Sequence, residues 1–128
     1  MPIPDYQECM LPLLQSLADG EVHSAKELTQ RVSDHFKLTD EDRQKLLPSG
    51  HQTYISNRVG WAKSYLKKAG LVANPTRGKI QITVEGRAVL TAPPIEIDCE
   101  FLKKYPSFVD FWNQAQKEAR RRRPIGAI

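Results

Sequence analysis

The sequence predicts a mainly α-helical fold with a small β-hairpin, on three observations. Apolar residues at helical spacing, preceded by N-capping residues, recur through roughly the first seventy residues. Two short apolar runs then flank a Pro-Thr-Arg-Gly turn at residues 75–78. A short helix follows them and closes the unit at about residue 90. Helices followed by a hairpin are the plan of a winged helix-turn-helix, in which the last long helix enters the major groove of DNA.

The first helix is expected from about Tyr6 to Ala18. Asp5 is placed as its N-cap, and Glu8 stands where it closes a capping box. Pro12 lies inside the apolar stripe and lacks the N–H that a helix interior needs. This proline predicts either a kink or a start nearer Leu11.

Two further helices are expected before Pro-Ser-Gly at residues 48–50 interrupts the chain. Ser24 and Glu27 form the signature of a capping box at the start of residues 23–36. Residues 38–47 are expected to form a third helix that begins at Thr39. Acidic residues fill its first turn, where the helix dipole favours negative charge.

The fourth and longest helix is expected from Gln52 or Thr53 to Ala69. Gly70 stands where a left-handed residue ends a helix, and Leu71 can fold back in a Schellman motif. At about 100° per residue, one face collects the residues expected to be buried, which are Ile55, Val59, Ala62, Leu66 and Ala69. The opposite face collects the residues expected to be exposed, which are Thr53, Ser56, Asn57, Gly60, Ser64, Lys67 and Lys68.

The rest of the chain is expected to form the hairpin and a helical tail. Strands are predicted within residues 71–75 and 79–83, and Thr83 is placed to cap a short helix. Residues 91–97 read as a linker because of their prolines. A helix, a turn at Pro106 and a second helix capped by Ser107, with Asp110 at the capping-box position, should follow. We expect a winged-helix domain at residues 1–90 and an appended helical linker or tail at residues 91–128.

Charge is distributed unevenly along the chain, although the net charge is only +4. Residues 1–48 carry five Lys or Arg against nine Asp or Glu, giving −4, whereas residues 49–90 carry seven against one, giving +6. The remaining residues carry seven against five, giving +2. A basic segment that coincides with the predicted long helix and hairpin indicates a surface for a polyanion.

The long helix and the hairpin supply the candidate DNA-binding residues. Thr53, Ser56 and Asn57 lie in the first turns, where base contacts are usual, and the amide of Asn57 suits adenine. Lysine and arginine side chains suit phosphates. The candidates are Gln52, Thr53, Ser56, Asn57, Gly60, Lys63, Ser64, Lys67, Arg77 and Lys79. The alternative interpretation is a solvated face without a partner.

Four neighbouring residues of that helix and one arginine cluster carry separate expectations. Gly60 lies on the exposed face, where a missing side chain would let the backbone approach DNA. Arg58 lies nearer the buried side and could brace the first helices through their acidic residues. Trp61 and Tyr65 flank the buried stripe and are expected to pack rather than stack on bases. The cluster Arg120–Arg123 is either a helix terminus or a DNA contact.

Catalytic and metal-binding motifs were sought and not found in the sequence. A lysine does not occur two residues after any acidic residue, so the D/E-x-K motif of restriction-type nucleases is lacking. The three histidines have no ligand spacing, and Cys9 and Cys99 have neither metal-ligand nor disulfide-scaffold spacing. No cofactor is expected. The N-terminus is not a signal peptide, no apolar run reaches the length of a membrane span, and a cytoplasmic setting is expected.

Three stretches resemble the N-terminal domain of Mrr-type restriction proteins. These are "MLPLLQSLADGEVHS", "LTDEDRQKLLPSGHQTYISNRVGWAKSYLKKAGLV" and "PTRGKIQITVEGRAVL", and "FLKKYPSFVDFW" is similar to the segment that follows that domain. The block from Leu47 to Leu71 is the most specific part. The resemblance implies a winged-helix domain that binds double-stranded DNA, tethered to a Mg²⁺-dependent nuclease that acts on DNA with methylated bases.

The nuclease half of that family is missing from the sequence, so we expect either an N-terminal fragment or a stand-alone relative. Two other functions remain open. One is a transcription regulator, for which the stripe Phe108, Phe111 and Trp112 could form a homo-oligomer. The other is a protein-interaction module that does not bind DNA.

Overall fold

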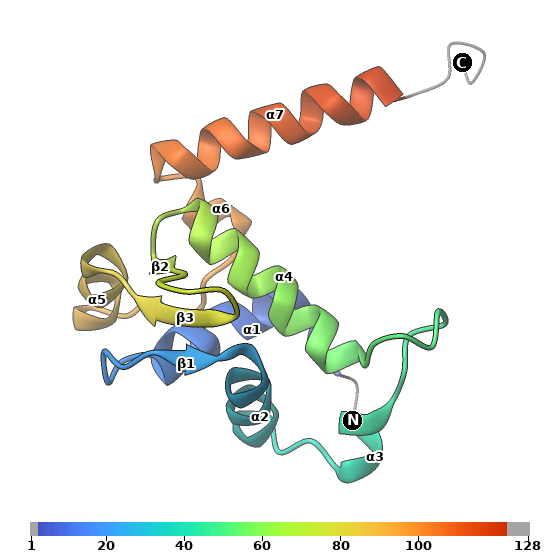
Figure 1. Cartoon of the computed structure of the whole chain (residues 1–128). Helices are drawn as coiled ribbons and strands as arrows, with labels where there is room; N and C mark the ends of the chain where they lie inside the picture. The colour runs from blue at the N-terminus through green and yellow to red at the C-terminus, as the bar shows by residue number, and fades with distance from the viewer. Residues whose placement is uncertain (1–2, 123–128) are drawn as a thin grey trace.

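A computed structural model describes residues 3–122 of the chain. Its helices pack beside a small antiparallel sheet, and the last helix extends away from the body (Figure 1). The elements are α1 (Tyr6–Ser16), β1 (His23–Ser24), α2 (Ala25–His35), α3 (Asp40–Gln44), α4 (Tyr54–Lys68), β2 (Val72–Ala73), β3 (Lys79–Ile82), α5 (Val84–Thr91), α6 (Cys99–Leu102) and α7 (Pro106–Arg122).

The sheet has the strand order β1-β3-β2. Val72 pairs with Ile82 in the predicted hairpin, and His23 pairs with Ile80 on the other side of β3. Strand β1 was not predicted, because two residues are too short to show the alternation that identifies a strand. With β1 in place, the order of elements completes a winged helix-turn-helix, so the predicted fold class is confirmed.

Helix α1 begins where its cap predicts. The Asp5 carboxylate accepts from the backbone N–H of Glu8 at 2.8 Å, and the Glu8 carboxylate accepts from the N–H of Asp5 at 3.1 Å. The alternative start nearer Leu11 is wrong, because this box fixes the first turn and the helix continues through the buried Pro12. The missing N–H of Pro12 leaves free the carbonyl of Glu8, which is an exposed residue that water can reach.

The cap of α2 forms only half of the predicted box. The hydroxyl of Ser24 accepts from the N–H of Glu27, but the Glu27 carboxylate accepts from other side chains. It bonds to Nδ1 of His23 at 2.8 Å and to Arg31 at 3.0 Å, while Nε2 of His23 bonds to Asp19 at 2.9 Å. His23 is only 6% exposed, so its ring is enclosed between two carboxylates.

The stability of the fold should therefore depend on pH through His23. The hydrogen bond to Asp19, helped by the bond to Glu27, raises the pKa of His23 above its ordinary 6.5. A raised pKa in the folded state means that this contribution to stability is complete below about pH 6.5 and is lost as the pH rises through the folded value. The free energy of unfolding in urea should be larger at pH 5.5 than at pH 8.5, and His23→Gln should remove the difference.

His51→Gln is the matched control for this prediction, because His51 is exposed and outside the cluster. It should leave the difference between the two pH values unchanged. Equal stability of the unmodified protein at pH 5.5 and pH 8.5 would show that the buried ring does not gain a proton on folding.

Helix α3 begins within one residue of the predicted start, with Thr39 as its N-cap, but its predicted continuation to Leu47 is wrong. The chain becomes extended at Lys45, and Leu46 forms an antiparallel bridge with Thr53. Proline at position 48 disfavours helical backbone at the residue before it, which contributes to this early end. Residues 45–53 therefore form a second small hairpin, named below the 45–53 hairpin.

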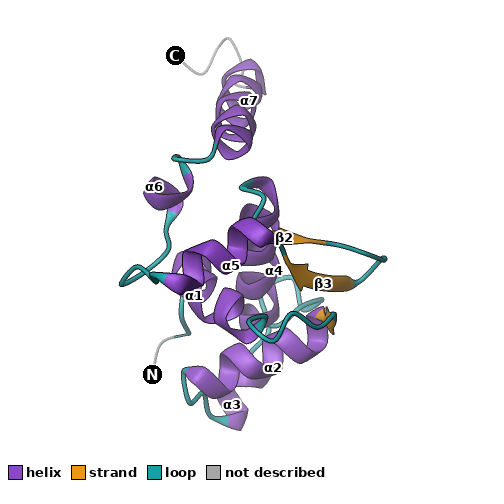
Figure 2. Cartoon of the chain, turned by 90° about the vertical axis from the view of Figure 1, so that its left-hand side faces the viewer, coloured by secondary structure: helices purple, strands orange, loops and turns teal. Residues whose placement is uncertain are grey.

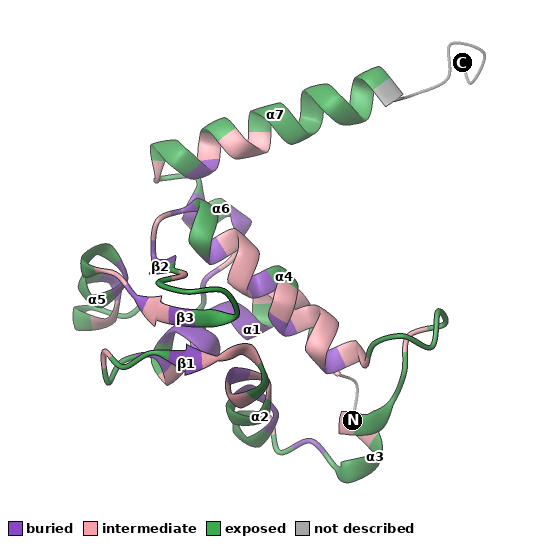
Figure 3. Cartoon of the chain, in the orientation of Figure 1, coloured by how far each residue is buried: buried purple, intermediate pink, exposed green. Residues whose placement is uncertain are grey.

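Helix α4 lies at the centre of the hydrophobic core and packs against both α1 and α2 (Figure 3). Its predicted apolar stripe is buried throughout, which confirms the assignment of its inner face. Residues from the C-terminal segment belong to the same core, namely Ile97, Cys99, Leu102 and Phe108. The domain boundary near residue 90 stays a prediction, but the segment after it is packed against the domain.

Helix α7 begins at Pro106, so the prediction that Ser107 caps it is wrong. Proline is well suited to the first position of a helix, because its fixed φ is helical and its missing N–H is not needed there. The N–H groups of Phe108 and Val109 bond to the carbonyl of Tyr105. The first turns of α7 contact the body, whereas its later residues are exposed (Figure 3).

The structure also shows the state of the two cysteines and whether a helix is long enough to span a membrane. Cys9 and Cys99 are both free and buried. Burial raises the pKa of the Cys9 thiol to about 12, which keeps this group protonated and unreactive at neutral pH. Among residues 3–122, none of the helices combines the length and the apolar character that crossing a bilayer requires.

Candidate nucleic-acid interface

The exposed face of α4 forms the centre of the candidate interface. Thr53 caps the helix, with its hydroxyl accepting from the N–H of Ser56 at 3.2 Å. At the other end, the N–H of Leu71 bonds to the carbonyl of Leu66, and Gly70 has φ of +83°. These bonds complete the predicted Schellman motif. A helix fixed at both ends presents its outer face in a defined orientation.

The structure places every candidate residue of this face at least partly in solvent. Thr53, Ser56, Asn57, Gly60, Lys63 and Ser64 are half-buried, and Gln52 and Lys67 are exposed. A shallow depression brings together Gln52, Asn57, Gly60, Lys63 and Ser64, beside Trp61. Lys67 lies one turn further along, outside that depression.

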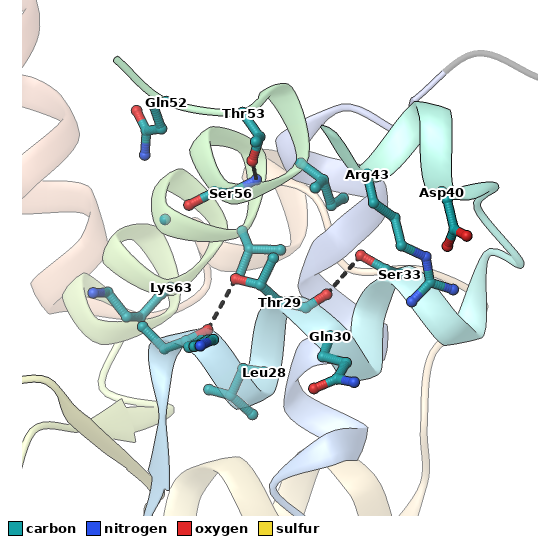
Figure 4. Close-up of a pocket in the computed structure, with 15 residues that line it drawn as sticks. Leu28, Thr29, Gln30, Ser33, Asp40, Arg43, Gln52, Thr53, Ser56 and Lys63 are labelled. Carbon is teal, nitrogen blue, oxygen red and sulfur yellow. Dashed lines mark hydrogen bonds between the residues drawn. The ribbon is translucent and has the colours of Figure 1, made fainter. Parts of the chain in front are cut away.

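A larger groove runs between α2 and α4, with a volume of about 740 Å³ (Figure 4). Hydroxyl groups from both helices line it, together with the amides of Gln30 and Gln52. The lysines at its edges come from different helices, Lys26 from α2 and Lys63 from α4. The remaining polar lining residues are Thr29, Ser33, Asp40, Arg43, Thr53 and Ser56.

The sequence did not predict the α2 side of this groove. Lys26 lies within residues 1–48, which carry a net negative charge. A charge count by segment therefore could not show that Lys26 lines the same groove as Lys63. Spacing held a usable signal, because Lys26, Gln30 and Ser33 recur at helical intervals opposite the buried Leu28. Arg43 is engaged in the fold, since it bonds to Asp34 at 2.8 Å and to the carbonyl of Leu38 at 3.0 Å.

The amide of Asn57 is held in position by its neighbours. Its oxygen accepts from Arg58 at 2.8 Å, and its nitrogen donates to the side-chain oxygen of Gln52 at 3.4 Å. The guanidinium of Arg58 lies 5.4 Å from the ring centroid of Tyr54. One hydrogen and one lone pair of the amide stay free, which are the groups that a bidentate contact with adenine uses.

Arg58 therefore has a different role from the one predicted. Among residues 3–122, the ion pairs do not include Arg58, so the expectation that it braces the first helices through their acidic residues is wrong. Its bond to Asn57 makes it a positioning residue for the candidate base contact. This bond could not be predicted from the sequence, because adjacent helical residues do not normally face each other.

Of the predictions for Gly60, Tyr65 and Trp61, the first two are confirmed in their packing and the third is wrong. A Cβ added at Gly60 would meet nothing within 4 Å, which confirms that core packing does not require this glycine. Tyr65 packs edge-on against Tyr6 and Phe108, as predicted. The expectation that Trp61 packs is wrong, because its side chain touches Tyr65 only edge-on and is 51% exposed.

The turn of the hairpin extends from the body as a wing (Figure 2). Gly78 takes φ of +76°, and the side chain of Asn74 donates to the carbonyl of Lys79 at 2.8 Å. Arg77 and Lys79 are exposed there. None of the ion pairs within residues 3–122 uses a residue of α4 or of this wing, so their positive charges are not neutralised internally.

The tail contributes packing to α4. Phe108 is completely buried, and Phe111 lies 5.6 Å from Tyr65 between ring centroids. Lys68 lies 5.2 Å from the ring of Phe111. Within the apolar stripe that suggested a homo-oligomer, Phe108 is buried, whereas Phe111 and Trp112 are half-buried, and oligomerisation stays a prediction. Of the arginine cluster, Arg120 and Arg121 are exposed at the end of α7, whereas Arg123 lies outside the described residues.

Comparison with known proteins gives two matches over the winged-helix part. Residues 6–92 match the family model of the Mrr N-terminal domain. The chain is 37% identical over 87 residues to the type IV methyl-directed restriction enzyme EcoKMrr of Escherichia coli (strain K12), covering 67% of this chain and 28% of that enzyme. No solved structure matches. The range matched by the family model contains every candidate DNA-binding residue.

Proposed function

Because the chain belongs to the Mrr N-terminal domain family, we propose that it is the DNA-binding module of a modification-dependent restriction endonuclease. The observation that carries this proposal is a helix face and a wing whose cations form no ion pair with an acidic residue among residues 3–122. The chain corresponds to 28% of the length of the curated relative that it matches. Cleavage is therefore assigned to a separate nuclease domain of the full-length protein.

In this proposal α4 lies in the major groove of duplex DNA. Its first turns face the base edges, where Asn57 is oriented by Arg58 and the hydroxyls of Thr53 and Ser56 are adaptable donors and acceptors. Lys63 and Lys67 neutralise phosphates on either side of the groove, and the wing adds Arg77 and Lys79. Lys26 at the start of α2 contacts the backbone of one strand, as the first helix of this motif usually does.

This module is proposed to supply binding rather than chemistry. Within residues 3–122, groups of three His, Cys, Asp or Glu side chains able to hold a metal ion are absent. The Mg²⁺ that restriction-type hydrolysis uses is placed, in this proposal, in the nuclease domain. The type IV relative is described as methyl-directed. A modified base in the major groove is thus the proposed target of the full-length protein.

Two substitutions should separate sequence reading from backbone contact. Asn57→Ala should cost about 1–3 kcal/mol of binding free energy at one base position and relax the base preference there, because it removes the oriented amide.

Lys67→Ala should weaken binding to all duplexes alike and reduce the slope of log K against log salt by about 1. If five cations contact phosphates, the slope for the unmodified chain is about −4.5. Fluorescence anisotropy with methylated and unmodified duplexes across a salt series measures these effects.

The same measurement decides among the functions left open by the sequence. Uniform weakening by Asn57→Ala would make this residue a backbone contact. Equal affinity for methylated and unmodified probes, with preference for a palindrome, would favour a transcription regulator. Lack of binding to any duplex at low salt would contradict DNA binding altogether and leave a protein-interaction module.

A further inference from the structure

The 45–53 hairpin is a built element and not only a break before α4. The N–H of Leu47 bonds to the carbonyl of Gln52 at 2.8 Å, and the N–H of Tyr54 bonds to the carbonyl of Lys45 at 2.9 Å. The turn is closed by the N–H of Gly50 bonding to the carbonyl of Leu47 at 2.8 Å. Gly50 has φ of +76°, a conformation that favours glycine.

This hairpin lies at the opposite end of α4 from the wing (Figure 1). It leads directly into Thr53, the N-cap of α4, and the bridge between Leu46 and Thr53 fixes it to that cap. Its base also contacts the first turn, where the ammonium of Lys45 lies 5.9 Å from the ring centroid of Tyr54. The hairpin is therefore joined to the first turn of α4 and lies beside the residues proposed to face the bases.

The surface of the hairpin has no evident role in the fold. Lys45, Pro48, Ser49, Gly50 and His51 are exposed, and Leu46 is 54% exposed although it is apolar. The segment from Arg43 to Glu85 contains no acidic residue before its last position, so the hairpin lies within the uninterrupted basic stretch. Lys45 at the base of the hairpin lines a depression together with Glu41 and Asp42 of α3, whereas the tip at residues 48–51 has no carboxylate. An exposed tip without acidic residues, beside the N-terminus of α4, can approach a polyanion.

Building on the proposed function, we propose that the 45–53 hairpin is a second DNA-binding arm that contacts the phosphate backbone beyond the bases read by α4. Ser49 and His51 supply hydroxyl and imidazole donors for phosphate oxygens. Helix α4 has 15 residues and is about 22 Å long. The arm and the wing thus contact the duplex at separate places on either side of α4.

The test introduces a negative charge at the tip of the hairpin. Ser49→Asp and His51→Glu should each weaken binding to a duplex by about tenfold, because each removes a donor and places a carboxylate against phosphates. Neither change should lower the urea midpoint, since both side chains are exposed. Hydroxyl-radical footprinting should show loss of protection at one end of the site, with protection elsewhere retained.

Gln15→Glu is the matched control, because it adds the same charge on the exposed side of α1. It should leave affinity unchanged. If both hairpin variants bind like the unmodified chain while Lys67→Ala is weakened, the arm is refuted and the proposed function stands. If the unmodified chain binds no duplex at low salt, the proposed function fails, and the arm fails with it.

Discussion

Gly60→Leu is expected to abolish most DNA binding while making the folded state slightly more stable. A Cβ at this position meets no atom within 4 Å, so the first carbon of a larger side chain fits without displacing a neighbour. Leucine has a higher helix propensity than glycine and should add roughly 0.5–1 kcal/mol to the free energy of unfolding. On DNA, the same side chain would hold the middle of α4 away from the base edges.

The expected loss in affinity follows from the contacts that this displacement removes. A mismatched base pair costs about 1–3 kcal/mol, so losing two base contacts costs about 2–6 kcal/mol, or at least thirtyfold in affinity. Anisotropy titrations and urea unfolding of the same sample measure both effects. Gly60→Ala should show the stabilisation with a much smaller loss of binding, and Gln15→Leu places a leucine on an exposed helix away from the interface.

The opposite result would change the role of this glycine. Unchanged binding by Gly60→Leu would mean that α4 does not approach DNA at its middle. Gly86 provides a contrast within the same chain, since a Cβ there would meet the carbonyl oxygen of Leu71 and lie 2.7 Å from a side-chain carbon of Ile82. Gly86 is thus needed for packing between α5 and the β2–β3 hairpin, whereas Gly60 is not needed for packing.

Phe108→Ala is expected to reduce the free energy of unfolding by about 3–5 kcal/mol, the range found for large aromatic residues in cores. The ring of Phe108 is fully buried and lies 5.8 Å from Tyr65 and 6.0 Å from Trp112 between centroids. Such a loss is a large share of the 5–15 kcal/mol that stabilises an ordinary domain. Urea or thermal unfolding measures it directly.

The control for this prediction is Gln114→Ala, a truncation at an exposed position of the same helix, which should change stability very little. A loss of less than about 1 kcal/mol for Phe108→Ala would be below the range for buried aromatic residues. The segment after residue 90 would then be an appendage that adds little to the fold. A loss in the expected range would make the start of α7 part of the folded unit.

Features decided by neighbouring residues were predicted well. The caps formed by Asp5, Ser24 and Thr83, and the Schellman end at Gly70, depend on residues a few positions apart. The cap predicted at Ser107 is the exception. The inner face of α4 follows from helical periodicity alone. These signals depend only on residues close in sequence, so contacts with the rest of the chain do not change them.

Features decided by distant residues were missed. Strand β1 exists because β3 offers it a partner, and the 45–53 hairpin exists because Leu46 meets Thr53. The lysine of α2 joins the groove only once α2 packs beside α4. Trp61 was expected to pack because it borders the buried stripe, but it is 51% exposed, and helical periodicity does not show how much of a bordering side chain the tertiary structure covers.

Because Ser24 pairs with Lys79, the wing is not a structural unit independent of α2. Ser24 caps α2, and the residue beside it, His23, is held by Asp19 and Glu27. The strand at the base of the wing is thus joined to residues 55 positions earlier in the chain. Contacts between such distant positions form slowly in folding, because a long loop must close first. Grafting this wing onto another helix pair would therefore require grafting β1 with it.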